Sequence, residues 1–282
     1  VVYVTTPNIF IPWAAFFRKK NKQVKRILEV RDLWPDSVKD IDKMNIDLFY
    51  PVLKFMEKML YKKSDKIVIN NEGFRSYISN ILPKKPQLYL PNAFTEEEVA
   101  FEVAPDNFRV IYTGNIGFAQ SYEKLQEMAH QLEKEKIHFK IIGYGVNAHL
   151  FQSYIEYNDF KYVTFEEEKT REECLIDIRS SNVQLSILKE SDVFLTVLPG
   201  KVIDGIASGV PVVTNLGGYT STLINSNLVG YAKENATTSE LVQAIRQIKN
   251  DKAHENLLRT NARNLLESDF LWERNIKKLE NF

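Results

Sequence analysis

The sequence has very few metal-binding and redox-active side chains for its 282 residues. Its single cysteine, Cys174, can form no disulfide within the chain and no multi-cysteine metal site. The four histidines, His130, His138, His149 and His254, show no spacing typical of metal ligands. We therefore expect neither a disulfide nor a metal site.

Long apolar runs are also missing. No stretch reaches the roughly 18 apolar residues of a membrane-spanning helix, and no signal-peptide pattern precedes the first β-rich run. We therefore expect a cytoplasmic protein that can lie at the inner face of a membrane. What is present suits folded cores: 44% of residues are hydrophobic, with 17 Phe and 13 Tyr. The length predicts two domains or one large one.

The net charge is zero but unevenly distributed. Residues 1–92 contain 17 basic and 9 acidic side chains, whereas the remainder contains 20 basic and 28 acidic ones. A basic first part beside an acidic second part predicts different partners for the two. No nucleic-acid partner is expected.

Strand, turn and helix recur along the chain at the length of a βαβ crossover. Strands are expected at 1–5, 26–31, 66–70, 87–90, 108–113, 139–142, 162–165, 183–187, 211–214 and 230–232. Helices are expected at 9–17, 50–63, 73–81, 122–136, 170–180, 201–209, 238–250 and 254–266, with one ending near 157. The pattern predicts an α/β protein with doubly wound parallel sheets. The acidic stretch 95–107 contains Pro105 and lacks periodicity, so we place the domain boundary there.

One expected helix, residues 50–63, has a clear apolar period. Its apolar residues recur three or four positions apart, which predicts one buried face. We expect that face to consist of Val52, Phe55, Met56, Met59 and Leu60.

The stretch from Leu198 to Val213 is a loop, a short helix and a buried strand. Pro199 and Gly200 can open a helix at Lys201, and Gly209 can close it. A helix start directs free N–H groups and its positive dipole end at whatever lies in front, and Lys201 adds a full charge. Asp204, one turn further, can face the same ligand. A ligand that places a phosphate at the helix start and a diol on Asp204 would be a nucleotide. The alternative is a helix–strand joint with a solvated lysine and aspartate.

Two glycine-containing loops follow the first two strands of the second series. Gly114 and Gly117 permit close backbone approach to a phosphate, and Gly143 and Gly145 to a flat base. Because ligands of such sheets bind outside the carboxyl ends of the strands, these loops and Lys201 are expected at one edge. Alone, each loop could be an ordinary turn.

Two stretches of the first part are candidates for binding. Arg31 and Asp32 follow the expected strand 26–31, at the edge where ligands bind; alternatively, Asp32 caps a turn and Trp34 fills space. The segment Phe16–Arg26 joins an aromatic helix to six basic residues between Arg18 and Arg26, which suits an anionic membrane surface. The alternative is a buried helix followed by a solvated loop.

Five motifs together resemble the retaining GT-B glycosyltransferases of family 4, of the bacterial capsule, O-antigen and exopolysaccharide type. They are Glu29-Val-Arg-Asp-Leu-Trp-Pro-Asp-Ser37, Leu90-Pro-Asn92, Tyr112-Thr-Gly-Asn-Ile-Gly117, Ile141-Ile-Gly-Tyr-Gly145 and Pro199-Gly-Lys-Val-Ile-Asp204 with Ala207-Ser-Gly-Val-Pro-Val-Val213. The resemblance implies two Rossmann-like domains facing a cleft. It divides the chain into a partial acceptor domain (1–94) lacking its start, a nucleotide-sugar domain (95–268) and a helix crossing back (269–282).

The resemblance also implies site residues. Donor contacts fall on Gly114, Asn115, Gly117, Gly143, Tyr144, Gly145, Pro199, Gly200, Lys201, Val202 and Asp204. Lys201 would stabilise the leaving diphosphate, with Arg31 assisting from across the cleft, and Asp204 would bind the ribose. Asp32 would contact the acceptor or orient Arg31. Two family features are absent: Thr196 stands where the family has a sugar-binding glutamate, and Thr5 and Thr6 stand where relatives carry a histidine.

The expected activity is therefore transfer of a hexosyl or N-acetylhexosaminyl group from a nucleotide sugar, with a UDP-sugar as the expected donor. Transfer would proceed with retention and without metal, to a glycan or lipid-linked acceptor. Two alternatives remain: a GT-B sugar-nucleotide epimerase, and a non-catalytic donor-binding half that needs a partner chain.

Overall fold

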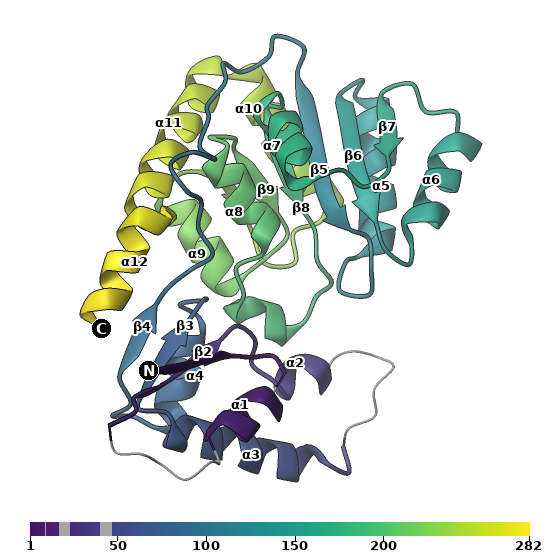
Figure 1. Ribbon diagram of the computed structural model, residues 1–282. Coiled ribbons are helices and arrows are strands. Elements are labelled where there is room, and N and C mark those ends of the chain that lie inside the picture. The colour runs from purple at the N-terminus through teal and green to yellow at the C-terminus, as the bar shows by residue number, and fades with distance from the viewer. Residues whose placement is uncertain (9, 17–22, 40–46) are drawn as a thin grey trace. The chain divides into compact units, whose positions relative to one another are not determined.

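The computed structural model describes residues 1–8, 10–16, 23–39 and 47–282. Its contacts divide the chain into two units (Figure 1). Unit 1 comprises Val1–Asn92, Ser191–Val197 and Arg274–Phe282, and unit 2 comprises Ala93–Glu190 and Leu198–Glu273. The first boundary thus falls at Asn92, beside the predicted one, and the short segment Ser191–Val197 is an unpredicted part of unit 1.

Unit 1 contains one four-stranded parallel sheet in the order β1-β2-β3-β4. Leu28 of β2 is in register with Val4 of β1 on one side and with Ile67 of β3 on the other. Its elements are β1 (Val2–Thr5), α1 (Phe10–Phe16), β2 (Arg26–Val30), α2 (Asp36–Lys39), α3 (Tyr50–Lys63), β3 (Lys66–Ile69), α4 (Phe74–Ile81), β4 (Gln87–Tyr89), a 3₁₀ helix (Asp192–Thr196) and most of α12 (Trp272–Asn281).

One hydrophobic cluster joins this sheet to three helices. Leu28, Val30, Ile67 and Ile69 point to the same side, and side chains of α1, α3 and α4 pack on them. Phe16 of α1 is fully buried there. The membrane surface predicted at Phe16–Arg26 therefore cannot use Phe16, and residues 17–22 lie outside the described residues.

Helix α3 has the predicted bounds but only part of the predicted buried face. Val52 and Phe55 are mostly exposed, whereas Leu60, Tyr61 and the carboxylate of Glu57 are buried. The apolar spacing located the helix correctly and was right that Met56 and Leu60 pack on the core, but it was wrong about Val52 and Phe55, which are exposed. Glu57 can be buried because Lys54, Tyr61 and Tyr77 bind its carboxylate.

Unit 2 contains a six-stranded parallel sheet in the order β10-β9-β8-β5-β6-β7. Its elements are β5 (Arg109–Asn115), α5 (Tyr122–Lys134), β6 (His138–Tyr144), α6 (Ala148–Tyr157), β7 (Val163–Glu166), α7 (Arg171–Arg179), β8 (Val183–Ser186), α8 (Gly200–Ala207), β9 (Val212–Thr214), α9 (Gly218–Ser226), β10 (Gly230–Ala232), α10 (Thr238–Asn250) and α11 (Lys252–Asp269). The strand order reverses between β5 and β8, which makes this sheet doubly wound.

Helices cover both faces of this sheet (Figure 1). One apolar cluster joins it to α5, α6 and α10, and a second joins it to α7, α8, α9 and α11. The α/β class with two parallel sheets is confirmed. Double winding is seen in unit 2 only, because the described strands of unit 1 follow one another in chain order.

No helix within the described residues combines the length and the apolar character that crossing a bilayer requires.

Candidate functional site

A cavity of about 380 Å³ opens in unit 2 where the strand order reverses. Its floor comes from the carboxyl end of β5 and from Leu188, just beyond β8. The crevice beside such a reversal is where open α/β sheets bind their ligands. The lining residues are Thr113, Gly114, Asn115, Gln120, Tyr144, Arg171, Cys174, Leu175, Ile178, Leu188, Pro199, Gly200, Lys201 and Asp204.

The ammonium group of Lys201 is the most unusual group in this cavity. Its Nζ atom is buried and has no hydrogen-bond partner among the described residues. It lies 3.9 Å from the ring centroid of Tyr112, whose hydroxyl is itself occupied in donating to the Asn115 carbonyl. Burial lowers the pKa of Lys201 to about 7, opposed by the nearby charge of Asp204. A buried, unsatisfied cation costs stability unless an anion neutralises it.

The start of α8 adds donors beside this ammonium. Pro199 is the N-cap and supplies no side-chain cap, while its carbonyl accepts from the N–H groups of Val202 and Ile203. The space in front of Gly200 is open: a Cβ there would meet nothing within 4 Å. Gly114, with φ +111°, brings its backbone close to Lys201, since its Cβ position would lie 3.9 Å from Nζ. Free N–H groups at a helix start and an ammonium together form an anion site.

Asp204 lies one turn into α8 and faces Arg171 from the start of α7. The Arg171 Nη1 to Asp204 Oδ1 distance is 3.6 Å, and the Arg171 side chain also pairs with Glu98 and stacks on the Phe94 ring. Burial raises the pKa of Asp204 to about 6, against the charges of Arg171 and Lys201, which lower it. A carboxylate of this kind can accept hydrogen bonds from a diol.

The glycines of the loops after β5 and β6 make room for side chains of the protein. A Cβ on Gly145 would lie 2.0 Å from Asn115 Oδ1, and one on Gly117 would lie 2.9 Å from the same side chain. A Cβ on Gly143 would clash with Phe165. Gly117 and Gly145 therefore have a packing role in seating Asn115, and Gly143 makes room for Ile116 and Phe165.

The structure brings together seven of the predicted donor contacts around the cavity: Gly114, Asn115, Tyr144, Pro199, Gly200, Lys201 and Asp204. Gly117, Gly143 and Gly145 are not among its lining residues. Val202 is fully buried in the core behind α8, with its N–H bonded to Pro199. Sequence reasoning missed Arg171 and Gln120; the only local signal for Arg171 was its place after Thr170, which caps α7.

The two other candidates, Arg31 and Asp32, belong to unit 1. The Arg31 guanidinium donates to Glu29 (3.2 Å) and to Asn92 Oδ1 (2.8 Å), so two of the sequence motifs meet there. Asp32 lines a cavity of only about 10 Å³ with Thr6 and Glu57, and burial raises its pKa. Thr196 donates its hydroxyl to the Val193 carbonyl, a local bond within the 3₁₀ helix.

No protein-family profile matches the chain, and no curated protein matches it in sequence. Solved structures match it in fold. TarM of S. aureus, solved with UDP and alpha-GlcNAc-glycerol, is 17% identical with a TM-score of 0.69, covering 99% of this chain and 54% of TarM. HepE of Anabaena, solved with UDP, is 10% identical with a TM-score of 0.73 (99% and 78% covered). WaaG, a glycosyltransferase of lipopolysaccharide biosynthesis, is 13% identical with a TM-score of 0.67 (91% and 74% covered).

The chain has the GT-B glycosyltransferase fold. It spans about half the length of TarM. At these identities the likeness establishes the GT-B fold alone.

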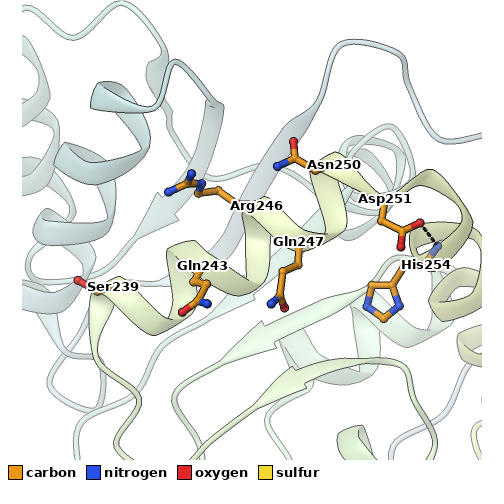
Figure 2. A pocket seen from close by; sticks show the side chains of 7 residues that line it. All are labelled: Ser239, Gln243, Arg246, Gln247, Asn250, Asp251 and His254. Atoms are coloured by element: carbon orange, nitrogen blue, oxygen red, sulfur yellow. Dashed lines mark hydrogen bonds between the residues drawn. The ribbon is translucent and has the colours of Figure 1, made fainter.

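Unit 2 of this GT-B chain has a larger hollow elsewhere, of about 780 Å³, over α10 and the start of α11. Figure 2 shows its polar side chains spread along α10 and the start of α11 instead of converging on a point. The one bond drawn there, from the His254 N–H to Asp251 Oδ1 (2.9 Å), is the N-cap of α11. The cavity at Lys201 is therefore the candidate site. Across the described ranges, no three His, Cys, Asp or Glu side chains are grouped to hold a metal ion.

Proposed function

We propose that the chain is a glycosyltransferase that binds a nucleotide sugar, a UDP-sugar, in the cavity of unit 2. It transfers a hexosyl or N-acetylhexosaminyl group with retention to a glycan or lipid-linked acceptor in the synthesis of a bacterial surface polysaccharide. The GT-B fold, and the UDP bound in the TarM and HepE structures, support the donor class. The family 4 resemblance supports retention and the polysaccharide role, with the protein working in the cytoplasm.

The observation that carries this proposal is the buried ammonium of Lys201. It has no hydrogen-bond partner among the described residues, and it lies beside an uncapped helix start and the backbone of Gly114. A diphosphate placed there would receive the charge-assisted hydrogen bonds that this group lacks. Asp204, one helical turn away, would accept from the ribose hydroxyls. The cavity volume of about 380 Å³ lies in the range of small-molecule sites.

The proposed reaction exchanges one bond at the anomeric carbon for another. The bond from this carbon to the β-phosphate oxygen breaks as its bond to the acceptor oxygen forms on the same face, and the acceptor proton passes to that phosphate oxygen. Negative charge grows on the leaving diphosphate, so fixed positive groups aimed at it lower the barrier. Lys201 and the start of α8 take this role, and we propose that no metal ion is needed.

Calorimetric titration with UDP and with uridine, in a chelator, tests the site. Lys201→Met should weaken UDP binding about 10- to 100-fold while leaving uridine binding nearly unchanged, because uridine has no diphosphate. Asp204→Asn should weaken both ligands about 10- to 100-fold, because both carry the ribose diol. Lys249→Met, an exposed lysine on α10, is the matched control and should change neither.

Three outcomes would contradict the proposal. If both variants bound UDP and uridine as tightly as the wild type, the ligand would not bind at Lys201 and Asp204. Loss of UDP binding on chelation would show that a metal is needed. Conversion of a UDP-sugar to its epimer without acceptor would favour the epimerase alternative.

A further inference from the structure

Helix α3 of unit 1 exposes apolar side chains on the side that faces away from its sheet. Leu60 and Tyr61 pack in the core of unit 1. Val52 and Phe55 of α3, and Leu48 and Phe49 in the turn just before it, are instead between 56% and 83% exposed. Together they present four large apolar groups within eight consecutive residues, which is unusual for a solvated surface.

Two lysines continue this exposed side along the helix. Phe55, Lys58 and Lys62 follow Val52 at intervals of three or four residues, the spacing that keeps side chains on one helix face. Lys58 and Lys62 are both exposed. The surface called here the α3 face consists of Leu48, Phe49, Val52, Phe55, Lys58 and Lys62.

The charge of this face has one sign. The only acidic residue of α3 is Glu57, which is 2% exposed and lies on the opposite side among Lys54, Tyr61 and Tyr77. Asp47 precedes the apolar residues, at the far end from the lysines. The α3 face itself therefore offers apolar groups at one end and cations at the other.

We propose that the α3 face docks onto an anionic phospholipid surface. Phe49, Val52 and Phe55 would enter the boundary between headgroups and acyl chains. Lys58 and Lys62 would extend their aliphatic stems along it and place their ammonium groups at the lipid phosphates. A protein partner fits less well, because buried protein interfaces are depleted in lysine.

This surface differs from the one predicted from the sequence at Phe16–Arg26, since Phe16 is buried. It also stands independently of the donor site, because all its residues belong to unit 1, whereas Lys201 and Asp204 belong to unit 2. Docking here would suit the lipid-linked acceptor of the proposed function. The vesicle experiment below can therefore fail without affecting the UDP titrations, and the reverse also holds.

Co-sedimentation of the full chain with lipid vesicles tests the proposal. Vesicles of phosphatidylcholine with 30% phosphatidylglycerol should bind the protein, and vesicles of phosphatidylcholine alone should bind it far less. The variant Lys58→Gln/Lys62→Gln should lower binding to the anionic vesicles about 25-fold at low salt, about fivefold for each lysine. The variant Val52→Ser/Phe55→Ser should lower it about tenfold or more at any salt concentration.

A matched pair of control variants distinguishes binding through the α3 face from nonspecific binding of the protein to vesicles. Tyr157→Ser/Leu257→Ser removes two exposed apolar groups of unit 2, and Lys249→Gln removes an exposed lysine there. Both should bind vesicles as the wild type does. The circular dichroism spectrum and the urea unfolding curve of every variant should match those of the wild type, which shows that each is folded. Equal losses in the controls, or wild-type vesicle binding by both α3 variants, would overturn the proposal. So would a wild-type dimer that Phe55→Ser dissociates in the absence of lipid.

Discussion

Glu57 in unit 1 and Lys201 in unit 2 are both buried charged groups, but their surroundings differ. The Glu57 carboxylate accepts hydrogen bonds from the hydroxyls of Tyr61 and Tyr77, each at 2.9 Å, and pairs with Lys54 at 2.6 Å. The Lys201 ammonium has an aromatic ring and a helix start beside it, but no hydrogen-bond acceptor in the described part of the chain. The protein surrounds one buried charge with hydrogen-bonding partners and gives the other none among the described residues.

The contrast separates structural charges from functional ones. Burying a charge costs several kcal/mol, and hydrogen bonds and counter-charges repay that cost only where they are complete. A complete set, as around Glu57, indicates a structural role. An incomplete set at the edge of an open cavity, as around Lys201, indicates a ligand that brings the missing charge.

The strongest way to break this contrast is to remove the satisfied charge. Glu57→Ala leaves the Tyr61 and Tyr77 hydroxyls without their acceptor, and leaves Lys54 with Asp36 as its counter-charge. We expect unfolding in urea to show a loss of about 3–5 kcal/mol. Lys58→Ala, one residue along on the exposed side of the helix, should change stability by less than about 0.5 kcal/mol. A loss below about 1 kcal/mol for Glu57→Ala would mean that the tyrosine and lysine contacts do little.

Removing the unsatisfied charge of Lys201 should raise the stability of the protein, whereas removing Glu57 should lower it. Folding lowers the pKa of Lys201 from its ordinary 10.5 to about 7, because the ammonium is buried. Between these pH values the unfolded chain binds a proton that the folded chain lacks, so the free energy of unfolding of the wild type rises with pH. Below pH 7 the lysine is charged in both states, and burying its charge lowers the stability by the full amount. Lys201→Met should therefore stabilise the ligand-free protein by about 1–4 kcal/mol at pH 6.

That gain should shrink as the pH is raised toward 10, and unfolding titrations at several pH values measure it. A Lys201→Met variant that is less stable than the wild type at pH 6 would show that the ammonium has a stabilising partner after all.

The smallest expected effect concerns Arg171, whose positive charge partly compensates the negative charge of the Asp204 carboxylate. Burial and the negative charge of Glu98 raise the pKa of the Asp204 carboxyl, whereas the positive charges of Arg171 and Lys201 lower it, and the result is a pKa of about 6. A folded pKa above the ordinary 3.8 means that uridine binding, which needs the ionised form, should decline as the pH falls through about 6.

Arg171→Gln should move that decline upward by up to about one pH unit, because it removes the cation that favours ionisation. Arg246→Gln is the matched control, since both arginine side chains are about half exposed and ion-paired. Calorimetry with uridine from pH 5 to 8 gives the midpoints. An unshifted midpoint for Arg171→Gln would remove this residue from the site.

Much of the fold was predictable because its signals are local. The bounds of α3 match the predicted 50–63, and Gly209 has the left-handed φ of +64° expected of a glycine just past the end of α8. The convergence of Gly114, Lys201 and Asp204 was predictable as well, since parallel strands present their carboxyl ends at one edge.

The rest depended on contacts between distant residues. The buried side of α3 includes the charged residue Glu57, whose carboxylate accepts a hydrogen bond from Tyr77 on another helix. Arg171 reaches Asp204 across 33 positions of sequence, and no spacing rule connects them. Helix α9, Gly218–Ser226, was not predicted, because its first residues are glycine and hydroxyl side chains with little apolar period.

The division of the chain has a consequence for any attempt to take it apart. The polypeptide passes between the two units after Asn92, Glu190, Val197 and Glu273. A protease that cuts once after Asn92 would thus release neither unit as a free piece, because Ser191–Val197 and Arg274–Phe282 stay joined to the remainder. A recombinant fragment starting at Ala93 would carry the same two orphaned segments, including Thr196, whose backbone is packed against Gly73. Isolating unit 2 calls for excising an internal loop as well as trimming both ends.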